Sequence, residues 1–509
     1  MPSGLLRLLH VRPGEGGRLA RVAAIGAAYA AATAIGNDVA ESIFVTRVGP
    51  QSLPVVFLAK GLLDVLAAAL YLPLARGRSE RAVWVTAITI YTAVVIGGRA
   101  VVASGSDASA YALFIGHEAA WTILTIHWGV YLLDVFDASQ ARRLFPLLFT
   151  TARAGGILAG LLVGLLATPL GAANLLLFGA MLAAGAGILA VARPDAPSVS
   201  PAASLRMEAA APEDDGDNDD DENDDALTGF VATWRRAFAS PLVRAIALST
   251  AAMVLVRYGL QMIALGQINR AMDGDNARVA SFLGLFGAVA NGAGILVGVF
   301  VVPRLLTRLG VGVANVLYAV FTALAYALLL VWPSLATAAV ARGTRVQLKD
   351  ALKTPLSTLF YGAEPPGRRA GARSFIFGFA IPIATVVAAG ALEAGRRGAT
   401  NLALVTWGGL GVAALFVAAS AVQNHRWRAR MIELLDRQLE RAPAAAPEAV
   451  AAARSHLVDA GTPASAVDRL ACGLTSTDAR VSALAEELLA EIVPRRRAHA
   501  LAATLRGGN

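Results

Sequence analysis

The sequence is poor in the features that define most enzymes and secreted proteins. Cys472 is the one cysteine in 509 residues, which excludes a disulfide framework within the chain and predicts a buried or inert thiol. A glycine-rich phosphate loop, a nucleophile elbow and paired cysteines are missing, as is the alternating strand pattern of a membrane barrel. We therefore expect no enzyme, no cofactor, no resident metal and no pump driven by its own ATPase.

Charge is scarce and apolar sequence is abundant. Only 16% of the residues are charged, 56% are hydrophobic, and the mean hydropathy is +0.59. Apolar runs of about 20 residues recur from Arg21 to Val422, and each can cross a bilayer as a helix. The first run carries Asn37, Asp38 and Glu41 and lacks a small-residue cleavage site, so we expect a retained span. The net charge of +8 is explained by arginines at span ends, and we expect no nucleic-acid partner.

The breaks between the apolar runs predict an all-α membrane protein with about twelve transmembrane helices in two groups of six. Two such halves separated by a long cytoplasmic segment are typical of a major-facilitator transporter, in which the halves rock about a central site. The predicted spans cover residues 20–46, 52–75, 81–103, 108–134, 145–168, 171–192, 242–267, 278–303, 309–332, 334–361, 372–395 and 400–423.

Outside the spans the composition changes twice. The acid run Glu213–Asp225 cannot bury apolar surface and lacks the glycine and closing glutamate of an EF-hand, so we favour a solvated, flexible linker over a calcium site. After His425, three amphipathic stretches predict a soluble helical tail that docks a protein partner and is separable from the membrane part. The predicted domains are an N-terminal transmembrane half (1–195), an acidic cytoplasmic linker (196–240), a C-terminal transmembrane half (241–424) and the tail (425–509).

The loops on one side of the predicted spans are richer in arginine than those on the other. The positive-inside rule therefore puts both termini on the cytoplasmic side of the cytoplasmic membrane. The arginine-rich side holds Arg7, Arg12, Arg18, Arg21, Arg76, Arg78, Arg81, Arg142, Arg143, Arg304, Arg308, Arg368, Arg369 and Arg373. The poorer side holds Arg47, Arg99, Arg270, Arg278, Arg396 and Arg397.

Several stretches resemble a known transporter family. HWGVYLLDVFDASQARRLFPLL is similar to the segment after the fourth span of the nucleotide transporters, the ATP/ADP translocases of plastids and obligate intracellular bacteria and their bacterial homologues. Similar segments are Asn37–Asp64, with a lysine at Lys60, and Phe282–Gly310. The matched residues of the first stretch are Trp128, Ala141, Arg142, Arg143, Phe145 and Pro146, and the tenth-span segment Arg345–Phe375 matches with Asp350 and Lys353.

This resemblance implies a divergent bacterial member with a HEAT-like tail, because TDARVSALAEELLAEIV is similar to a HEAT-type repeat. Asn37 and Ala40 stand where the family's nucleotide carriers have basic residues. The charged segment before the fifth span, which contains Arg142 and Arg143, is then expected to be a hinge loop in which Pro146 ends a helix. The glycines of that span, Gly156, Gly160 and Gly164, are expected to let it pack closely on a neighbour.

Ionisable residues inside the spans are candidates for the transport site, because they are costly in a bilayer and need a partner or a substrate. Asp38 and Glu41 share a helix face near the outer end, which fits a gate or solvent exposure better than proton coupling. Lys60 can pair with Asp64 four residues on or contact an anion. Arg257, four residues before Gln261, cannot release its charge and needs an acid or an anion.

The fourth span holds a second polar group. His117, Glu118 and His127 could suggest a metal site, but ten residues between the histidines do not fit a helical zinc face. We favour hydrogen-bonded packing with the neighbouring tryptophans and assign Glu118, together with Asp38, Glu41 and Asp64, to gating or coupling.

The tenth span carries four cations at intervals of three, four and four residues, which a regular α-helix would keep on one face. One aspartate, Asp350, cannot neutralise them, so some must pair with acids of the other half or with an anionic substrate. For the two nearest the cytoplasm, snorkelling to the headgroups is the alternative. With Lys60 and Arg257, the expected substrate-binding residues are Arg342, Arg345, Lys349, Asp350 and Lys353.

These patterns predict a secondary transporter that moves a nucleotide-like or other organic anion across the cytoplasmic membrane by alternating access, of which ATP:ADP antiport is one form. The alternative is a transport-inactive membrane scaffold or sensor whose tail binds a protein partner.

Overall fold

The structure is a computed structural model of the whole chain. It describes residues 12, 15–75, 78–136, 138–192, 234–364, 366–398, 402–440, 446–459, 462 and 464–493. The acid run and most of the predicted linker lie outside these residues, and so do the loop arginines Arg7 and Arg76. The side chains of Asp64, Arg142, Arg143 and Pro146 are likewise outside the description.

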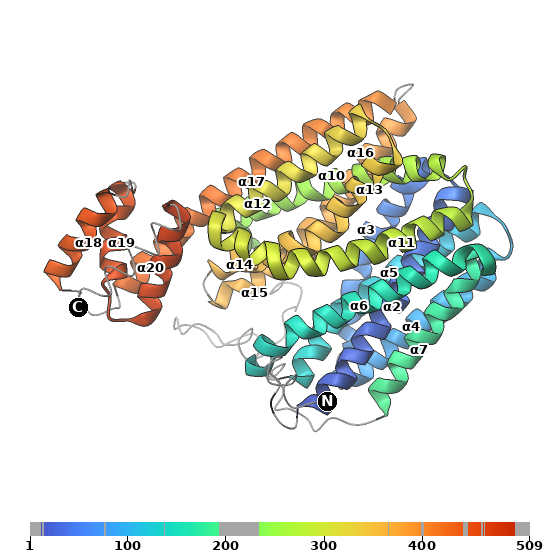
Figure 1. Cartoon of the computed structure of the whole chain (residues 1–509), viewed down its shortest axis with the longest axis horizontal. Helices are drawn as coiled ribbons and strands as arrows, with labels where there is room; N and C mark the ends of the chain where they lie inside the picture. Colours follow the sequence, from blue (N-terminus) through green and yellow to red (C-terminus); the bar gives the residue numbers. More distant parts are fainter. Residues whose placement is uncertain are drawn as a thin grey trace, which may run out of the picture.

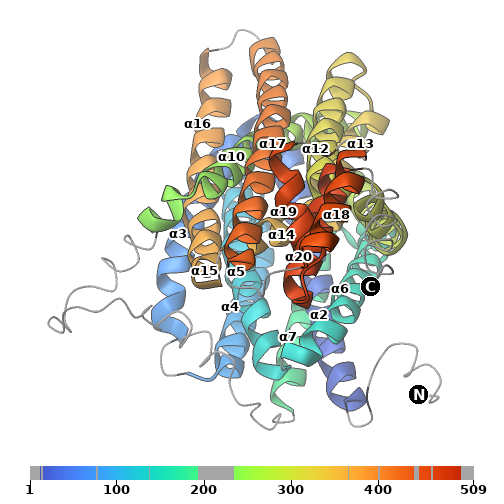
Figure 2. The same cartoon turned by 90° about the vertical axis from the view of Figure 1, so that its left-hand side faces the viewer.

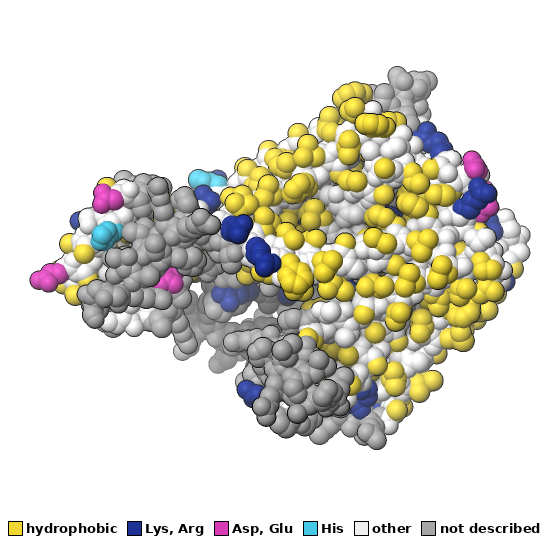
Figure 3. Space-filling model, viewed as in Figure 1, with side chains coloured by type: hydrophobic (Ala, Val, Ile, Leu, Met, Phe, Trp, Pro, Cys, Tyr) yellow, Lys and Arg dark blue, Asp and Glu magenta, His cyan; other side chains and the backbone are white. Residues whose placement is uncertain are grey.

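The described chain is a bundle of long helices followed by a group of short ones (Figure 1). Nine of the described helical segments are long and apolar enough to cross a membrane. The face of the bundle seen in Figure 3 is covered by hydrophobic side chains, and its Lys and Arg side chains lie toward its ends. An apolar surface of this kind requires a lipid environment, because water would not solvate it.

The first half of the bundle lies below the second in Figures 1 and 2. Its helices alternate in direction, so consecutive spans are antiparallel. They are α2 (Gly16–Arg47), α3 (Leu53–Ala75), α4 (Glu80–Val102), α5 (Asp107–Val135), α6 (Ala138–Leu170) and α7 (Leu175–Val191), with short 3-10 turns η1 (Pro50–Ser52) and η2 (Ala172–Asn174) between them.

The second half repeats this arrangement, with π-helical segments inside three of its spans. Gly310, with φ of +83°, breaks α12 into the end of one span and the start of the next. The elements are α10 (Pro241–Ala271), α11 (Asn276–Leu296), η3 (Val297–Val301), α12 (Val302–Val331), α13 (Leu335–Gly343), η4 (Thr344–Lys353), α14 (Thr354–Gly362), α15 (Pro366–Phe375), η5 (Ile376–Ala380), α16 (Ile381–Gly398) and α17 (Leu402–Leu439).

Helix starts follow the side-chain capping rules. Ser79, Ser106, Ser240 and Asp275 each accept a hydrogen bond from the backbone N–H three residues on, which satisfies a donor that the first turn leaves unpaired. Ser334 forms a full capping box with Thr337. These caps fix where the spans begin, and thereby the register of the charged residues within them.

The two halves meet most closely where α6 crosses α11. A Cβ atom added to Gly160 would collide with the backbone oxygen of Gly284, and one added to Gly284 would meet the backbone of Gly160. Gly156 and Gly164 also face α11. The expectation that the glycines of the fifth span allow close packing is confirmed, and the neighbour belongs to the other half.

The stretch that precedes the fifth span is a helix rather than the expected hinge loop. Helix α6 starts at Ala138, and it continues without a break through Pro146. Alanine, glutamine, arginine and leucine in this stretch favour helix, and a proline inside a transmembrane helix is tolerated where neighbours satisfy the freed backbone groups.

The tail consists of α18 (Pro447–Asp459), α19 (Ala464–Leu474) and α20 (Ala479–Ile492), and it follows the end of α17. Helix α17 has 38 residues, and about 57 Å of helix exceeds a hydrocarbon layer of about 30 Å, so it passes from the membrane into the tail without interruption. We call the end of the bundle where α2 begins and α17 leaves the tail end, and the opposite end the distal end.

Candidate functional site

The two halves are joined by a buried network of charges, which we call the inter-half cluster: Asp38 and Glu41 of α2, Gln261 of α10, Arg342 of α13 and Arg345 of η4. Arg342 donates to Glu41 Oε2 at 2.6 Å and to Asp38 Oδ1 at 3.2 Å. Arg345 donates to Gln261 Oε1 at 2.7 Å, and its other Nη lies 3.8 Å from Glu41 Oε1. Gln261 donates to that same carboxylate at 2.9 Å.

The inter-half cluster closes the bundle near its distal end. Glu41 lies six residues before the end of α2 and Arg342 seven residues after the start of α13, so both are about 10 Å inside that end. The side chains of Arg342 and Glu41 are 9% and 1% exposed. The small pocket bordered by Gln261, Arg342 and Arg345 is too small to admit a water molecule. Toward the tail end, α6 diverges from α14 and α15 (Figure 1).

Of the alternatives left open by the sequence, Arg342 and Arg345 take the pairing with acids of the other half. Asp38 and Glu41 are buried, so the solvent exposure that the sequence allowed for them is wrong. Buried ion pairs of this kind cost desolvation, and removing one partner is strongly destabilising. The cluster therefore has to be broken as a unit whenever the halves separate at the distal end.

Lys60 forms a second polar group within the first half. Its Nζ lies 3.1 Å from Glu118 Oε2 and 3.3 Å from Thr122 Oγ1, and it sits 5.5 Å from the ring centre of Trp121. The sequence assigns Glu118 to gating or coupling. In the structure its carboxylate is the ion-pair partner of Lys60.

The middle of the second half holds three cations, Arg257, Arg345 and Lys349, within electrostatic range of one another. Lys349 pairs with Asp350 at 3.0 Å, and their side chains are 30% and 48% exposed. Arg257 lies within electrostatic range of Lys349 and Arg345. In the part of the chain that the structure describes, the Arg257 guanidinium has no hydrogen-bond or ion-pair partner, and its Nε is buried. It lies four residues, about 6 Å, nearer the tail end than Gln261.

Lys353 does not share the face of the other tenth-span cations. Its side chain is buried inside the second half, where Nζ donates to Asn315 Oδ1 at 2.6 Å and lies 6.0 Å from the ring centre of Phe416. The regular α-helix assumed for this span is wrong, because residues 344–353 form the π-helix η4. A π-helical turn closes i→i+5 hydrogen bonds and takes more residues, so each interval of four falls short of a full turn, and the shortfalls add up from Arg342 to Lys353.

The histidines of α5 take part in packing. His127 Nε2 lies 2.5 Å from the backbone oxygen of Glu80, and the His117 ring lies 5.7 Å from the Tyr91 ring at 67°. No group of three metal-ligating side chains occurs among the residues that the structure describes.

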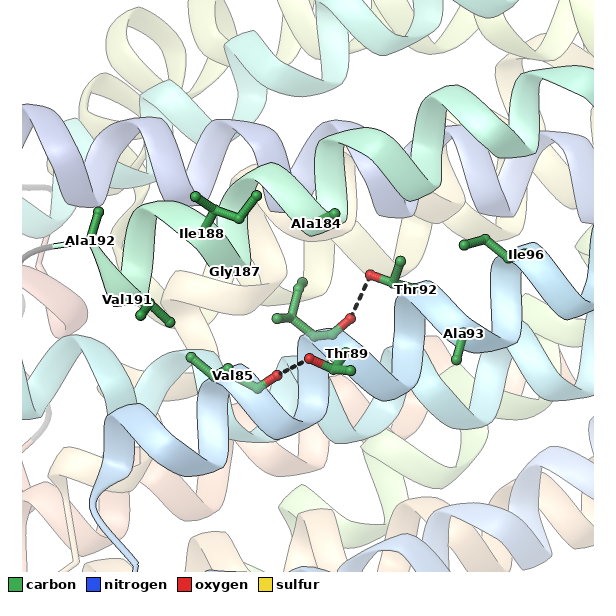
Figure 4. A pocket seen from close by; sticks show the side chains of 11 residues that line it. Val85, Thr89, Thr92, Ala93, Ile96, Ala184, Gly187, Ile188, Val191 and Ala192 are labelled. Carbon is green, nitrogen blue, oxygen red and sulfur yellow. Dashed lines mark hydrogen bonds between the residues drawn. The ribbon is translucent and has the colours of Figure 1, made fainter.

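A groove of about 600 Å³ lies on the outside of the first half, between α4 and α7 (Figure 4). Its walls are apolar, and the hydroxyls of Thr89 and Thr92 are satisfied by carbonyls of their own helix at 2.8 Å. Ile96 and Ile188 on its rim are 49% and 68% exposed. Without a charged or unsatisfied group, this groove does not suit a polar solute, and we place the candidate site at the charged residues between the halves.

Sequence reasoning missed the contacts between the tail and the bundle. Glu491 of α20 accepts hydrogen bonds from the backbone N–H groups of Val311 and Gly312 at 2.5 and 3.4 Å, directly after the break at Gly310. Arg430 of α17 lies 3.6 Å from Glu364, which follows α14. An acid in an amphipathic helix ordinarily faces solvent, so the sequence carries no signal for such a contact.

Comparison with known proteins identifies the fold. The chain is similar to the nucleoside transporter NupG in its D323A mutant (TM-score 0.57, 15% identity, 81% of this chain and 99% of that chain). It is also similar to the POT family transporter PepTSo (TM-score 0.55, 12% identity, covering 81% and 98%) and to a D-xylose-proton symporter (TM-score 0.51, 11% identity, covering 80% and 96%). No protein-family model matches the sequence, and no curated protein matches it.

The chain is therefore an all-helical, multi-pass membrane protein with the major-facilitator fold. At these identities the likeness shows the fold alone. The resemblance to nucleotide transporters and the HEAT-like nature of the tail receive no support from the comparisons and stay predictions.

Proposed function

We propose that the protein is a secondary transporter that carries an organic anion across the cytoplasmic membrane by alternating access. The observation that supports this most directly is Arg257. A guanidinium keeps its charge at any physiological pH, and an unpaired charge inside a membrane protein costs several kcal/mol or faces a water-filled path. Arg257 lies within electrostatic range of Lys349 and Arg345 and has no partner among the described residues. An anionic solute supplies the missing charge.

Two further features favour a path through this region. Lys349 and Asp350 are partly exposed although they lie in the middle of a span, which fits a path that water reaches from the tail end. Arg257 also lies on the tail side of the closed inter-half cluster, where a solute would arrive after entering from that end.

A nucleotide-like anion exchanged in the manner of ATP:ADP antiport is the finer form of this proposal. It rests on the sequence resemblance described above. We also propose that the tail end faces the cytoplasm, because the arginine-rich loops lie at that end. The four-domain layout and a protein partner for the tail are further parts of the proposal.

Thermal unfolding of the purified protein tests anion binding, because a ligand that binds the folded state raises the unfolding temperature in proportion to its occupancy. We expect at least one member of a panel of ATP, ADP, inorganic phosphate, malonate and glucose 6-phosphate to stabilise the protein beyond equal ionic strength of potassium chloride. Arg257→Gln should weaken that stabilisation by about tenfold or more in apparent affinity, since a hydrogen bond between charged groups contributes about 1.5–3 kcal/mol.

Arg368→Ala is the matched control, because Arg368 is an exposed arginine beside the same bundle and should leave the stabilisation unchanged. If no anion stabilises the wild type, or if Arg257→Gln binds as tightly as the wild type, the anion-site proposal is wrong. The transport-inactive scaffold would then be the better account.

A further inference from the structure

We propose that Asp38 and Glu41 form a proton-binding site that is filled when the distal end opens, so that solute movement is coupled to protons. This inference builds on the proposed transporter function, since alternating access requires the halves to separate at that end. It names the coupling ion, which the general anion proposal leaves open, and it is an alternative to the ATP:ADP exchange form, in which a second anion provides the driving force.

The starting point is the charge balance of the inter-half cluster. In the closed state, two carboxylates of the first half face two guanidiniums of the second, and the four charges cancel. The acids and the arginines sit on opposite halves, so each opening of the distal end separates them completely. No rearrangement within one half can keep the pairs together.

The two sides of the broken cluster respond differently. Arginine cannot release its proton, so Arg342 and Arg345 stay charged and face the distal opening, where an anion can bind them. Asp38 and Glu41 lie three residues apart on one helix face and lose both of their cations. Two adjacent carboxylates in a poorly solvated site favour uptake of a proton, because burial and a like charge both disfavour the ionised form.

The other groups around the acids cannot replace the arginines. From α10 the contact is the neutral Gln261, and from α11 it is Gly287, whose added Cβ would lie 3.7 Å from Asp38 Oδ2. Helices α6 and α7 pack on an earlier part of α2, where Gly155 meets Ala27 and Gly179 meets Ala32. On α2 itself Asn37 donates to Asp38 at 3.2 Å, and α5 presents His117 against Gly36.

The cycle that follows is balanced. As the distal end opens, Arg342 and Arg345 move away from the acids and bind the anion. A proton from water at that end then forms an O–H bond with one carboxylate of the acid pair. When the distal end closes, the returning guanidiniums favour the ionised carboxylates, and the proton is released to water on the tail side. Anion and proton therefore move in the same direction.

The sign of the pH effect is fixed by this scheme. The acids are protonated in the distal-open state and ionised in the closed state, so acidification favours opening. Coupling to one proton makes the open-to-closed ratio rise about tenfold per pH unit where the site titrates.

The experiment uses spin labels and needs no known substrate. Cys472→Ser removes the one cysteine, and Ala103→Cys and Ala271→Cys then label exposed residues at the distal ends of α4 and α10, one in each half. Pulsed electron-spin measurements on the reconstituted full chain give the distance distribution between pH 8 and pH 5. We expect a growing population of longer distances on acidification, and in Glu41→Gln a dominant long distance at every pH.

Glu393→Gln is the matched control, because Glu393 is an acid at the distal end that pairs with Arg396 of its own helix and lies outside the inter-half cluster. It should keep the wild-type pH response. If Glu41→Gln does not fold, the test uses Asp38→Asn together with the pH dependence of the wild-type distance distribution. A distribution that does not change with pH in the wild type, or a Glu41→Gln or Asp38→Asn variant that responds like the wild type, would overturn the proton site.

The outcome is separable from that of the proposed function. A pH-independent distal end in a protein that is stabilised by an anion would refute only the proton site. A pH-dependent distal end in a protein that no anion stabilises would refute only the anion function.

Discussion

At the scale of single residues, the structure distinguishes two intramembrane cations that the sequence treats alike. Arg257 and Lys353 both lack an acid partner among the described residues, but their surroundings differ. Arg257 lies within electrostatic range of Lys349 and Arg345, whereas Lys353 is 3% exposed and donates to Asn315 within the second half. The first arrangement suits a ligand and the second suits packing.

Lys353→Met tests this distinction. Methionine conserves the length and most of the volume of lysine, and replacing a buried charge by an apolar side chain of similar size is often neutral or stabilising. We expect the anion affinity measured by thermal shift to change by less than about threefold, against about tenfold or more for Arg257→Gln. An equal loss in both variants would place Lys353 at the anion site after all.

The pairing of Arg342 with Asp38 and Glu41 was within reach of the sequence, because four cations and one local acid leave an imbalance that another span must correct. The sequence did not indicate which of the four cations would turn toward the acids. That choice depends on η4, and intrinsic helix preferences do not distinguish a π-helical segment from an α-helix.

At the scale of elements, the tail is fastened to the second half more firmly than its composition suggests. Glu491 is buried and accepts from two backbone N–H groups at the start of the span that follows Gly310, which is the role of a helix N-cap supplied from another element. The expected independence of the tail overlooks this contact, since Glu491 lies on an amphipathic helix that could equally face water.

Glu491→Gln should therefore loosen the tail. The amide keeps the size of the side chain but loses the charge that favours a helix N-terminus, at a cost of about 0.5–2 kcal/mol. We expect faster cleavage of the segment between α17 and α18 in limited proteolysis, with Glu448→Gln, an exposed acid on α18, as control. Equal cleavage rates in both variants would mean that the capping contact does not hold the tail.

At the scale of the whole molecule, hydropathy predicted the fold class well because a bilayer imposes a minimum length of apolar helix on every span. Most predicted span limits lie within a few residues of the observed helices, and the largest departures are α6, which starts at Ala138 instead of residue 145, and α17, which runs on to Leu439. Both helices extend through polar sequence beyond the membrane, where hydropathy carries no information.

The inter-half cluster and the close crossing of α6 and α11 together describe a bundle that is closed at its distal end and diverges toward the tail end (Figure 1). Alternating access needs a second state in which these contacts are broken. The sequence could propose the charges on each helix, but their meeting across the halves depends on the tertiary arrangement.

Counterflow in proteoliposomes tests the central claim, transport of an anion, most directly. Vesicles loaded with each unlabelled anion of the panel are diluted into the same labelled anion, and uptake is followed over time. We predict transient accumulation of at least one anion in wild-type vesicles, its loss in Arg257→Gln and its retention in Arg368→Ala. Accumulation no greater than in protein-free vesicles for every anion, or undiminished accumulation in Arg257→Gln, would contradict the account.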